Sequence, residues 1–133
     1  MPYQEIPHTA DVALRVWAGD LAALYAEAAE GMCALLAAEP APGDEESRQV
    51  EVRGDDAESL LVAWLQELLY LAETERVMFT GFQVQTAAPP CLRAEVRGRP
   101  LARLGKWIKA VTYHNIKIQS TAEGFEVTIV FDV

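Results

Sequence analysis

The stretch Glu126-Val-Thr-Ile-Val-Phe-Asp-Val133 decides how the rest of the chain is interpreted. Every second residue from Val127 to Val133 is apolar, a period of two that predicts a β-strand with one buried face. The carboxylate of Asp132 is followed directly by the α-carboxylate of Val133. Two anionic groups one residue apart on a rigid strand can form half of a site for a hard cation.

A third carboxylate is found near the other end of the chain, at Asp11 in the stretch Pro7-His-Thr-Ala-Asp11. An aspartate in a turn also has a purely structural use, because short polar side chains hydrogen-bond the local backbone. If the strand after Asp11 neighbours the last strand, then Asp11, Asp132 and Val133 converge. Three oxygen-bearing groups without a cysteine suit Ca²⁺ or Mg²⁺ better than zinc. We therefore expect the two ends of the chain to share a divalent ion.

Size and composition favour one cytoplasmic domain. The length of 133 residues and an apolar content of 51% fit a single globular unit with its own core. No apolar run approaches the ~18 residues of a membrane span, and the N-terminus lacks the basic and apolar regions of a signal peptide. Cys33 and Cys91 are too few for a disulfide framework and lack zinc-type spacing, so we expect reduced, buried thiols.

The charge of the chain is unevenly distributed. The formal net charge of −9 argues against general, charge-driven binding of nucleic acid. The stretch from Cys91 to Lys117, however, contains seven Lys and Arg residues and a single acid, Glu95. Its net charge is therefore +6, and that of the remainder is −15. Such a stretch either meets an electrostatically matched protein partner or pairs with acids on the protein's own surface.

The spacing of apolar residues predicts two helices. One follows a capping aspartate, Asp20, and covers residues 21–37 with a stripe at three- and four-residue spacing. The other opens at Asp55 and Asp56, where acids favour the positive end of the helix dipole, and ends near residue 75. Its apolar stripe is strong enough for a helix that lies deep against a sheet.

Alternation and turn residues predict the strands. They cover residues 3–6, 12–19, 49–53, 77–79 with 83–86, 92–97, 116–120 and 125–133, the last two as a hairpin around Glu123-Gly124. Residues 40–46 and 98–105 are predicted to be loops, and residues 106–114 fit neither pattern. We expect an α+β fold: a single two-layer domain over residues 1–133, with a mixed or antiparallel sheet of about six or seven strands against two helices.

Other polar residues allow more than one interpretation. His8 and His114 could each be a ligand or a base, or simply donate to a backbone carbonyl in a turn. Lys106 and Lys109 could meet a phosphate or a partner's carboxylate, or remain solvated, and Trp107 between them suits a core or an interface. The sequence has no nucleophile elbow, phosphate-binding glycine loop or paired-cysteine zinc motif, so a small metal-dependent hydrolase is the least favoured function.

Four stretches resemble one known family, the archeases, in that family's order and across nearly the whole chain. They are His8-Thr-Ala-Asp11, Leu60-Leu-Val-Ala-Trp-Leu-Gln-Glu-Leu-Leu-Tyr70, Ile108-Lys-Ala-Val-Thr-Tyr-His114 and Phe131-Asp-Val133. The resemblance implies a small cytoplasmic α+β protein that is not an enzyme but a cofactor of the tRNA-splicing RNA ligase. That ligase joins a 3′-phosphate or cyclic-phosphate end to a 5′-hydroxyl end through a guanylylated histidine. The cofactor promotes ligase guanylylation and multiple turnover.

The same resemblance implies a bound divalent ion, usually calcium, with Mg²⁺ or Mn²⁺ as alternatives. Its ligands carry over onto Asp11, Asp132 and Val133. The segment containing Lys109 and His114 is implied to be functionally important. Direct contact with RNA is left open.

The family also suggests a second role, as a chaperone or specificity modulator of a tRNA methyltransferase. Three features depart from the family pattern. Pro7 replaces a residue that is commonly acidic, Gln66 stands where asparagine is usual, and residues 98–106 lack an expected histidine.

Overall fold

The computed structural model describes residues 2–6 and 11–133. Two helices and nine strands occur in these ranges. The elements are β1 (Tyr3–Ile6), β2 (Val12–Ala18), α1 (Leu21–Leu36), β3 (Glu39–Pro40), β4 (Glu46–Arg53), α2 (Ala57–Thr74), β5 (Val77–Ala88), β6 (Cys91–Arg103), β7 (Ala110–Val111), β8 (Gln119–Thr121) and β9 (Gly124–Asp132).

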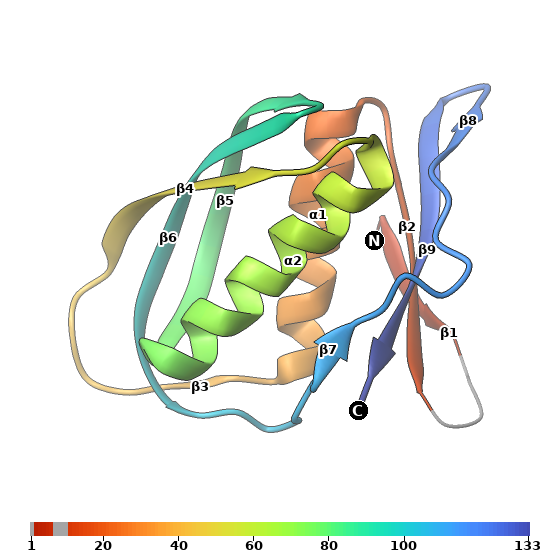
Figure 1. Cartoon of the computed structure of the whole chain (residues 1–133). Helices are drawn as coiled ribbons and strands as arrows, with labels where there is room; N and C mark the ends of the chain where they lie inside the picture. The colour runs from red at the N-terminus through yellow and green to blue at the C-terminus, as the bar shows by residue number, and fades with distance from the viewer. Residues whose placement is uncertain (1, 7–10) are drawn as a thin grey trace.

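The strands form two antiparallel sheets. A five-stranded sheet has the order β1-β2-β9-β7, with β8 also paired to β9, and a four-stranded sheet has the order β3-β6-β4, with β5 also paired to β6. The two helices lie between the sheets (Figure 1): α1 contacts β2 and β5, and α2 contacts β4, β5 and β7. The predicted α+β class is confirmed, but the described chain has nine strands in two sheets instead of six or seven in one.

Both predicted helix starts are confirmed by their caps. The Asp20 side chain accepts a hydrogen bond from the backbone N–H of Ala23 at 2.8 Å, and Asp56 accepts one from Ser59 at 2.7 Å. Each cap satisfies a backbone donor that has no partner inside the helix. The bond from Ser59 also lowers the pKa of Asp56 below its ordinary value.

The two helices are joined through a fully buried tryptophan and tyrosine. The indole Nε1–H of Trp64 donates to the carbonyl of Tyr25 at 2.9 Å, and the Tyr25 hydroxyl donates to the carbonyl of Ala57, also at 2.9 Å. Burial raises the pKa of Tyr25, so its hydroxyl remains a donor. Because the indole N–H of Trp64 and the hydroxyl of Tyr25 both have partners, the pair adds apolar packing without leaving either group unsatisfied.

The predicted loop at residues 98–105 is wrong. Strand β6 continues to Arg103, where Pro100 pairs with Val77 and Leu101 with Pro40. A Cβ at Gly98 would lie 2.4 Å from Val77 Cγ1, so this glycine permits close strand approach and does not mark a turn. Strand β5 likewise runs unbroken where two strands are predicted.

Other predictions hold with small shifts. The final hairpin is present as β8 and β9, with a shorter first arm than predicted. Cys33 and Cys91 are free, and each is partly buried instead of fully buried. Across the described residues, neither helix has both the length and the apolar content to cross a membrane.

Candidate functional site

The start of β2 and the end of β9, near the two ends of the sequence, lie side by side at one end of the five-stranded sheet. Strand β2 pairs antiparallel with β9, and Val12 lies opposite Phe131. Asp11 directly precedes Val12 and Asp132 directly follows Phe131, so the two aspartates leave the same end of this strand pair. In Figure 1 the C-terminus and the beginning of β2 lie at the same end of the sheet. The predicted proximity of Asp11 and Asp132 is therefore present, whereas the start of β1, near the N-terminus, lies farther along β2, where Tyr3 pairs with Val16.

Strand β7 pairs with the end of β9 on the side opposite β2. Ala110 pairs with Asp132, and the backbone N–H of Lys109 donates to the carbonyl of Asp132 at 2.7 Å. The backbone N–H and the hydroxyl of Thr112 both donate to the carbonyl of Val130, each at 3.0 Å. The last residues of the strand are thus fixed on both sides, between β2 and the segment around β7.

The fixed backbone presents the Asp132 carboxylate outward. Phe131 is fully buried, so the alternation of the strand directs Asp132 to the opposite face, where its side chain is exposed. We call the end of β9 with Asp11, Asp132 and Val133 the acidic tip. Its side-chain donors are all oxygen atoms, which fits a hard cation such as Ca²⁺ or Mg²⁺.

The acidic tip has only two acidic side chains. Among residues 2–6 and 11–133, no three His, Cys, Asp or Glu side chains gather closely enough to hold a metal ion. A divalent ion at the tip would therefore need main-chain oxygens, such as those of Val133, or water to complete its coordination. His8, another predicted candidate, lies outside the described residues.

The remaining predicted residues lie along one segment, residues 104–118, which we call the lysine segment. Lys109 is directly beside the acidic tip through its backbone bond to Asp132. Lys106 is fixed at the end of α1, where its N–H donates to the Leu36 carbonyl at 3.0 Å. His114 is exposed beyond β7, with its Nε2 3.2 Å from the side-chain amide of Asn115. These residues are spread along the segment, with Lys106 before and His114 after the contact of Lys109 with the tip.

Two residues of α2, Gln66 and Glu58, hold the lysine segment against this helix through contacts that the sequence did not predict. The side-chain amide of Gln66 donates to the carbonyl of Val111 at 3.2 Å, and Glu58 accepts from the N–H of Ile118 at 2.9 Å. Beneath them, Ile108 and Val111 are buried in the core. One sequence signal was available, since Gln66 interrupts an otherwise apolar run from Leu60 to Leu65 and its continuation in Leu68 and Leu69.

Three aromatic side chains are strongly exposed on α2 and the lysine segment. Tyr70 is 59% exposed, Trp107 58% and Tyr113 62%. Among the described residues, the only other large apolar side chain in this class is Trp17, at 37%. Since α2 and β7 contact each other, the three aromatics come from neighbouring elements beside the acidic tip. Large exposed apolar groups of this kind commonly mark interaction surfaces.

The basic stretch predicted from the sequence divides into two parts. On β6, Arg93 pairs with Glu51 at 3.0 Å, Arg97 with Glu45 at 4.0 Å, and Arg103 with Glu39. The three lysines of the lysine segment form no ion pair within the described ranges 2–6 and 11–133. Pairing with the protein's own acids therefore accounts for much of the charge on β6, but not for the charge beyond it.

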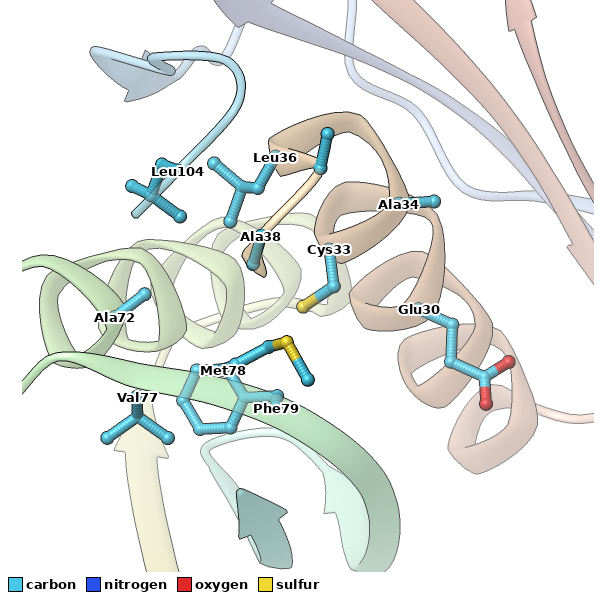
Figure 2. Close-up of a pocket in the computed structure, with 11 residues that line it drawn as sticks. Glu30, Cys33, Ala34, Leu36, Ala38, Ala72, Val77, Met78, Phe79 and Leu104 are labelled. Atoms are coloured by element: carbon cyan, nitrogen blue, oxygen red, sulfur yellow. The ribbon is translucent and has the colours of Figure 1, made fainter. Parts of the chain in front are cut away.

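A groove of about 360 Å³ lies between α1, the end of α2 and the start of β5 (Figure 2). Its lining is mostly apolar, with Glu30 as the charged residue and Cys33 in the wall. The surrounding atoms desolvate the Cys33 thiol and raise its pKa to about 12. This thiol stays protonated at neutral pH, so it is a poor nucleophile and behaves as a packing group.

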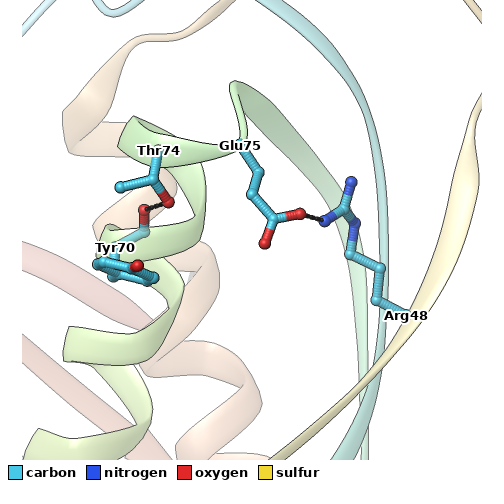
Figure 3. Close-up of polar contacts among 4 residues, drawn as sticks. All are labelled: Arg48, Tyr70, Thr74 and Glu75. Carbon is cyan, nitrogen blue, oxygen red and sulfur yellow. Dashed lines mark hydrogen bonds and ion pairs between the residues drawn. The ribbon is translucent and has the colours of Figure 1, made fainter.

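A second cavity, also of about 360 Å³, lies beside the four-stranded sheet. Its charged lining residues are Arg48, Arg76, Arg99, Asp44, Glu46 and Glu75. Arg48 is paired with Glu75, as Figure 3 shows, and Arg76 donates to the carbonyl of Ala102 at 2.7 Å. Three cations and three carboxylates balance, so this cavity offers little net attraction for a charged ligand.

Comparison with known proteins identifies the family. The model of the Archease protein family (MTH1598/TM1083) matches residues 3–133. Protein archease of Methanopyrus kandleri is 36% identical in an alignment of 126 residues, which covers 90% of this chain and 90% of that protein. The solution structure of protein 1598 of Methanobacterium thermoautotrophicum is 25% identical with a TM-score of 0.77, over 99% of both chains.

The crystal structure of an archease from Thermotoga maritima, named a possible chaperone, has the same fold. It gives a TM-score of 0.67 at 20% identity and covers 98% of this chain and 96% of its own. The resemblance first seen in four short stretches is thus confirmed over the whole length, and the chain belongs to the archease family.

Proposed function

We propose that this protein is a cytoplasmic accessory protein of the tRNA-splicing RNA ligase. It binds the ligase and promotes guanylylation and multiple turnover, and does not itself join RNA ends. Two observations support the proposal: membership of the archease family, and an acidic tip whose Asp132 side chain is exposed at the surface. An exposed carboxylate at the tip can reach a site on a partner protein.

The proposed metal ligands are Asp11, Asp132 and the main-chain oxygens of Val133, with Ca²⁺ as the ion and Mg²⁺ or Mn²⁺ as substitutes. The observation that carries this assignment is the pairing of Val12 with Phe131, which makes the two aspartates neighbours. A bound ion would supply positive charge at the tip, where phosphate or carboxylate oxygens of a partner could approach. The chain itself positions the ligands, because the N–H of Lys109 fixes the backbone of Asp132.

Purified ligase, GTP and metal, with and without this protein, test the function directly. Guanylylated ligase should accumulate faster when the protein is present. Asp132→Asn should abolish most of the increase, because it keeps the shape of the side chain but removes its charge. Asp44→Asn, an exposed loop aspartate away from the tip, is the matched control and should activate normally. Ligase that is guanylylated equally well alone would eliminate this function.

Metal binding is tested separately by calorimetry with Ca²⁺. Asp11→Asn and Asp132→Asn should each weaken binding at least about tenfold, since each removes a charged oxygen ligand. An extension after Val133 should weaken binding more than an extension before Met1 if the terminal carboxylate is a ligand. Equal affinities of the two extended proteins would remove Val133 from the ligand set and leave the aspartates.

A second candidate function is a chaperone or specificity modulator of a tRNA methyltransferase. The exposed aromatics beside the tip favour it, as does the name of the Thermotoga maritima protein. This role predicts that the protein suppresses light scattering by aggregating methyltransferase, and that Asp132→Asn suppresses it equally. Activation of the ligase by an Asp11→Asn protein would shift support toward such a metal-independent role.

A further inference from the structure

We infer that the exposed aromatics beside the acidic tip, and lysines that form no ion pair within residues 2–6 and 11–133, form a docking surface for an acidic patch on a partner protein. We call this surface the docking ridge. It is defined by five residues of the lysine segment, Lys106, Trp107, Lys109, Tyr113 and Lys117, together with Tyr70 on the neighbouring helix α2. The inference rests on the proposed function and deepens it. It takes the RNA ligase as the partner that binds this surface, and it assigns binding of the ligase to the ridge and activation of the ligase to the acidic tip.

The first argument is the exposure of apolar surface. Trp107 and Tyr113 are 58% and 62% exposed, although neighbouring Ile108 and Val111 are buried at 0% and 3%. The segment thus divides its large apolar side chains between the core and the outer surface. Tryptophan and tyrosine are the residues most enriched among those that dominate binding energy at protein interfaces.

The second argument is that the ridge is ordered before any partner binds. Its backbone is anchored by Lys106 N–H to Leu36, Lys109 N–H to Asp132 and Ile118 N–H to Glu58, at 2.7 to 3.0 Å. A surface that is already fixed loses less conformational entropy on binding than a flexible loop would. The exposed aromatics are therefore presented by a rigid support.

The third argument is charge. The lysine segment has three lysines and no acid in a chain whose net charge is −9. Ion pairs neutralise Arg93 and Arg97 on β6, whereas Lys109 and Lys117 are exposed without an ion-pair partner in the described part of the chain. A partner with acidic groups opposite these lysines would be attracted and oriented.

An acidic protein surface fits this ridge better than RNA does. An RNA strand carries negative charge along its whole length and would be repelled by the acidic remainder of the chain. A folded protein needs acidic groups only opposite three lysines, and can place apolar groups against Trp107 and Tyr113. Because Lys109 is bonded to the backbone of Asp132, a partner seated on the ridge lies beside the tip.

The experiment measures binding of the full-length protein to purified ligase by calorimetry, apart from guanylylation. The double variant Trp107→Ala with Tyr113→Ala, and separately Lys109→Glu with Lys117→Glu, should each raise Kd by at least about tenfold. Matched controls are Trp17→Ala, an exposed tryptophan elsewhere, and Arg93→Glu with Arg97→Glu on β6. The controls should stay within about twofold of the wild-type Kd, because they lie outside the ridge.

Since all four proteins change exposed side chains, circular dichroism should show the wild-type fold. The lysine variant should also reduce the dependence of Kd on NaCl concentration. Ridge variants that bind as tightly as the wild type, while the wild type still activates the ligase, overturn this inference and leave the proposed function standing. A wild-type protein that neither binds nor activates the ligase overturns both. Ridge-dependent binding of a labelled single-stranded RNA, with ligase binding unchanged, assigns the ridge to RNA and overturns the protein partner.

Discussion

Strand β6 and the lysine segment are successive parts of one basic stretch, yet their charges are used differently. Arg93 lies directly opposite Glu51 in the register of β6 and β4, and the two side chains are paired. The lysine segment contacts α2 and the end of β9, and its lysines find no such acid within the described chain. The sign of a charge run therefore does not reveal its role, because the neighbouring strand decides whether the charge is neutralised.

The comparison also separates two kinds of surface. Cross-strand ion pairs on an exposed sheet face contribute little stability, and their main consequence is that β6 presents little net positive charge. The lysine segment keeps its positive charge and adds exposed Trp107 and Tyr113. Both parts nevertheless pack into the same hydrophobic core. Leu92 and Val96 anchor β6, and Ile108 anchors the lysine segment.

The largest expected effect tests whether β6 and the lysine segment are anchored equally firmly in the hydrophobic core. Ile108→Ala and Leu92→Ala each remove a side chain that is 0% exposed. Each should lower the free energy of unfolding in urea by about 2–5 kcal/mol, from lost burial and the cavity left behind. Thr128→Ala, at an exposed position of β9, is the control and should change it little. A cost below about 1 kcal/mol for Ile108→Ala would mean that the segment is only loosely held, and the comparison would fail.

The sequence was sufficient for the parts of the fold that local chemistry determines. The cap at Asp20, the helix start at Asp55 and Asp56 and the alternation of β9 are local signals, and these predictions are confirmed. The neighbourhood of Asp11 and Asp132 was also predictable, because it needed only the pairing of two alternating strands. Whether these residues bind a metal remains a prediction.

The failures occur where tertiary contacts override the local pattern. Gly98 and Pro100 suggest a loop, but cross-strand neighbours on β5 hold them in β6. The sequence of the lysine segment has no helix or strand periodicity, because only Ala110 and Val111 of this segment form a strand. Gln66 on α2 holds the segment through a contact from a distant part of the chain. Such contacts between distant residues leave little trace in a single sequence.

An intermediate effect is expected for the contact that ties the lysine segment to α2. Gln66→Leu keeps the approximate size of the side chain but removes its hydrogen bond to the Val111 carbonyl. The free energy of unfolding should fall by about 1 kcal/mol, and amide hydrogen exchange should accelerate at Lys109 and Thr112. Gln83→Leu, on the exposed face of β5, provides the control. Unchanged exchange at both amides would show that backbone pairing with β9 alone orders the segment.

The smallest effect tests the charge difference itself. Arg93→Gln and Lys109→Gln each remove one positive charge, so long-range repulsion in this acidic chain changes similarly in both. Of the two, Arg93 alone has an ion-pair partner among the described residues, Glu51, and at low salt its loss should lower Tm by about 1 °C more than the loss of Lys109 does. In about 0.5 M NaCl the difference should vanish, because screening removes the attraction between exposed charges. An equal or larger drop for Lys109→Gln at low salt would reveal a stabilising partner for that lysine, and the two parts of the basic stretch would no longer be distinct.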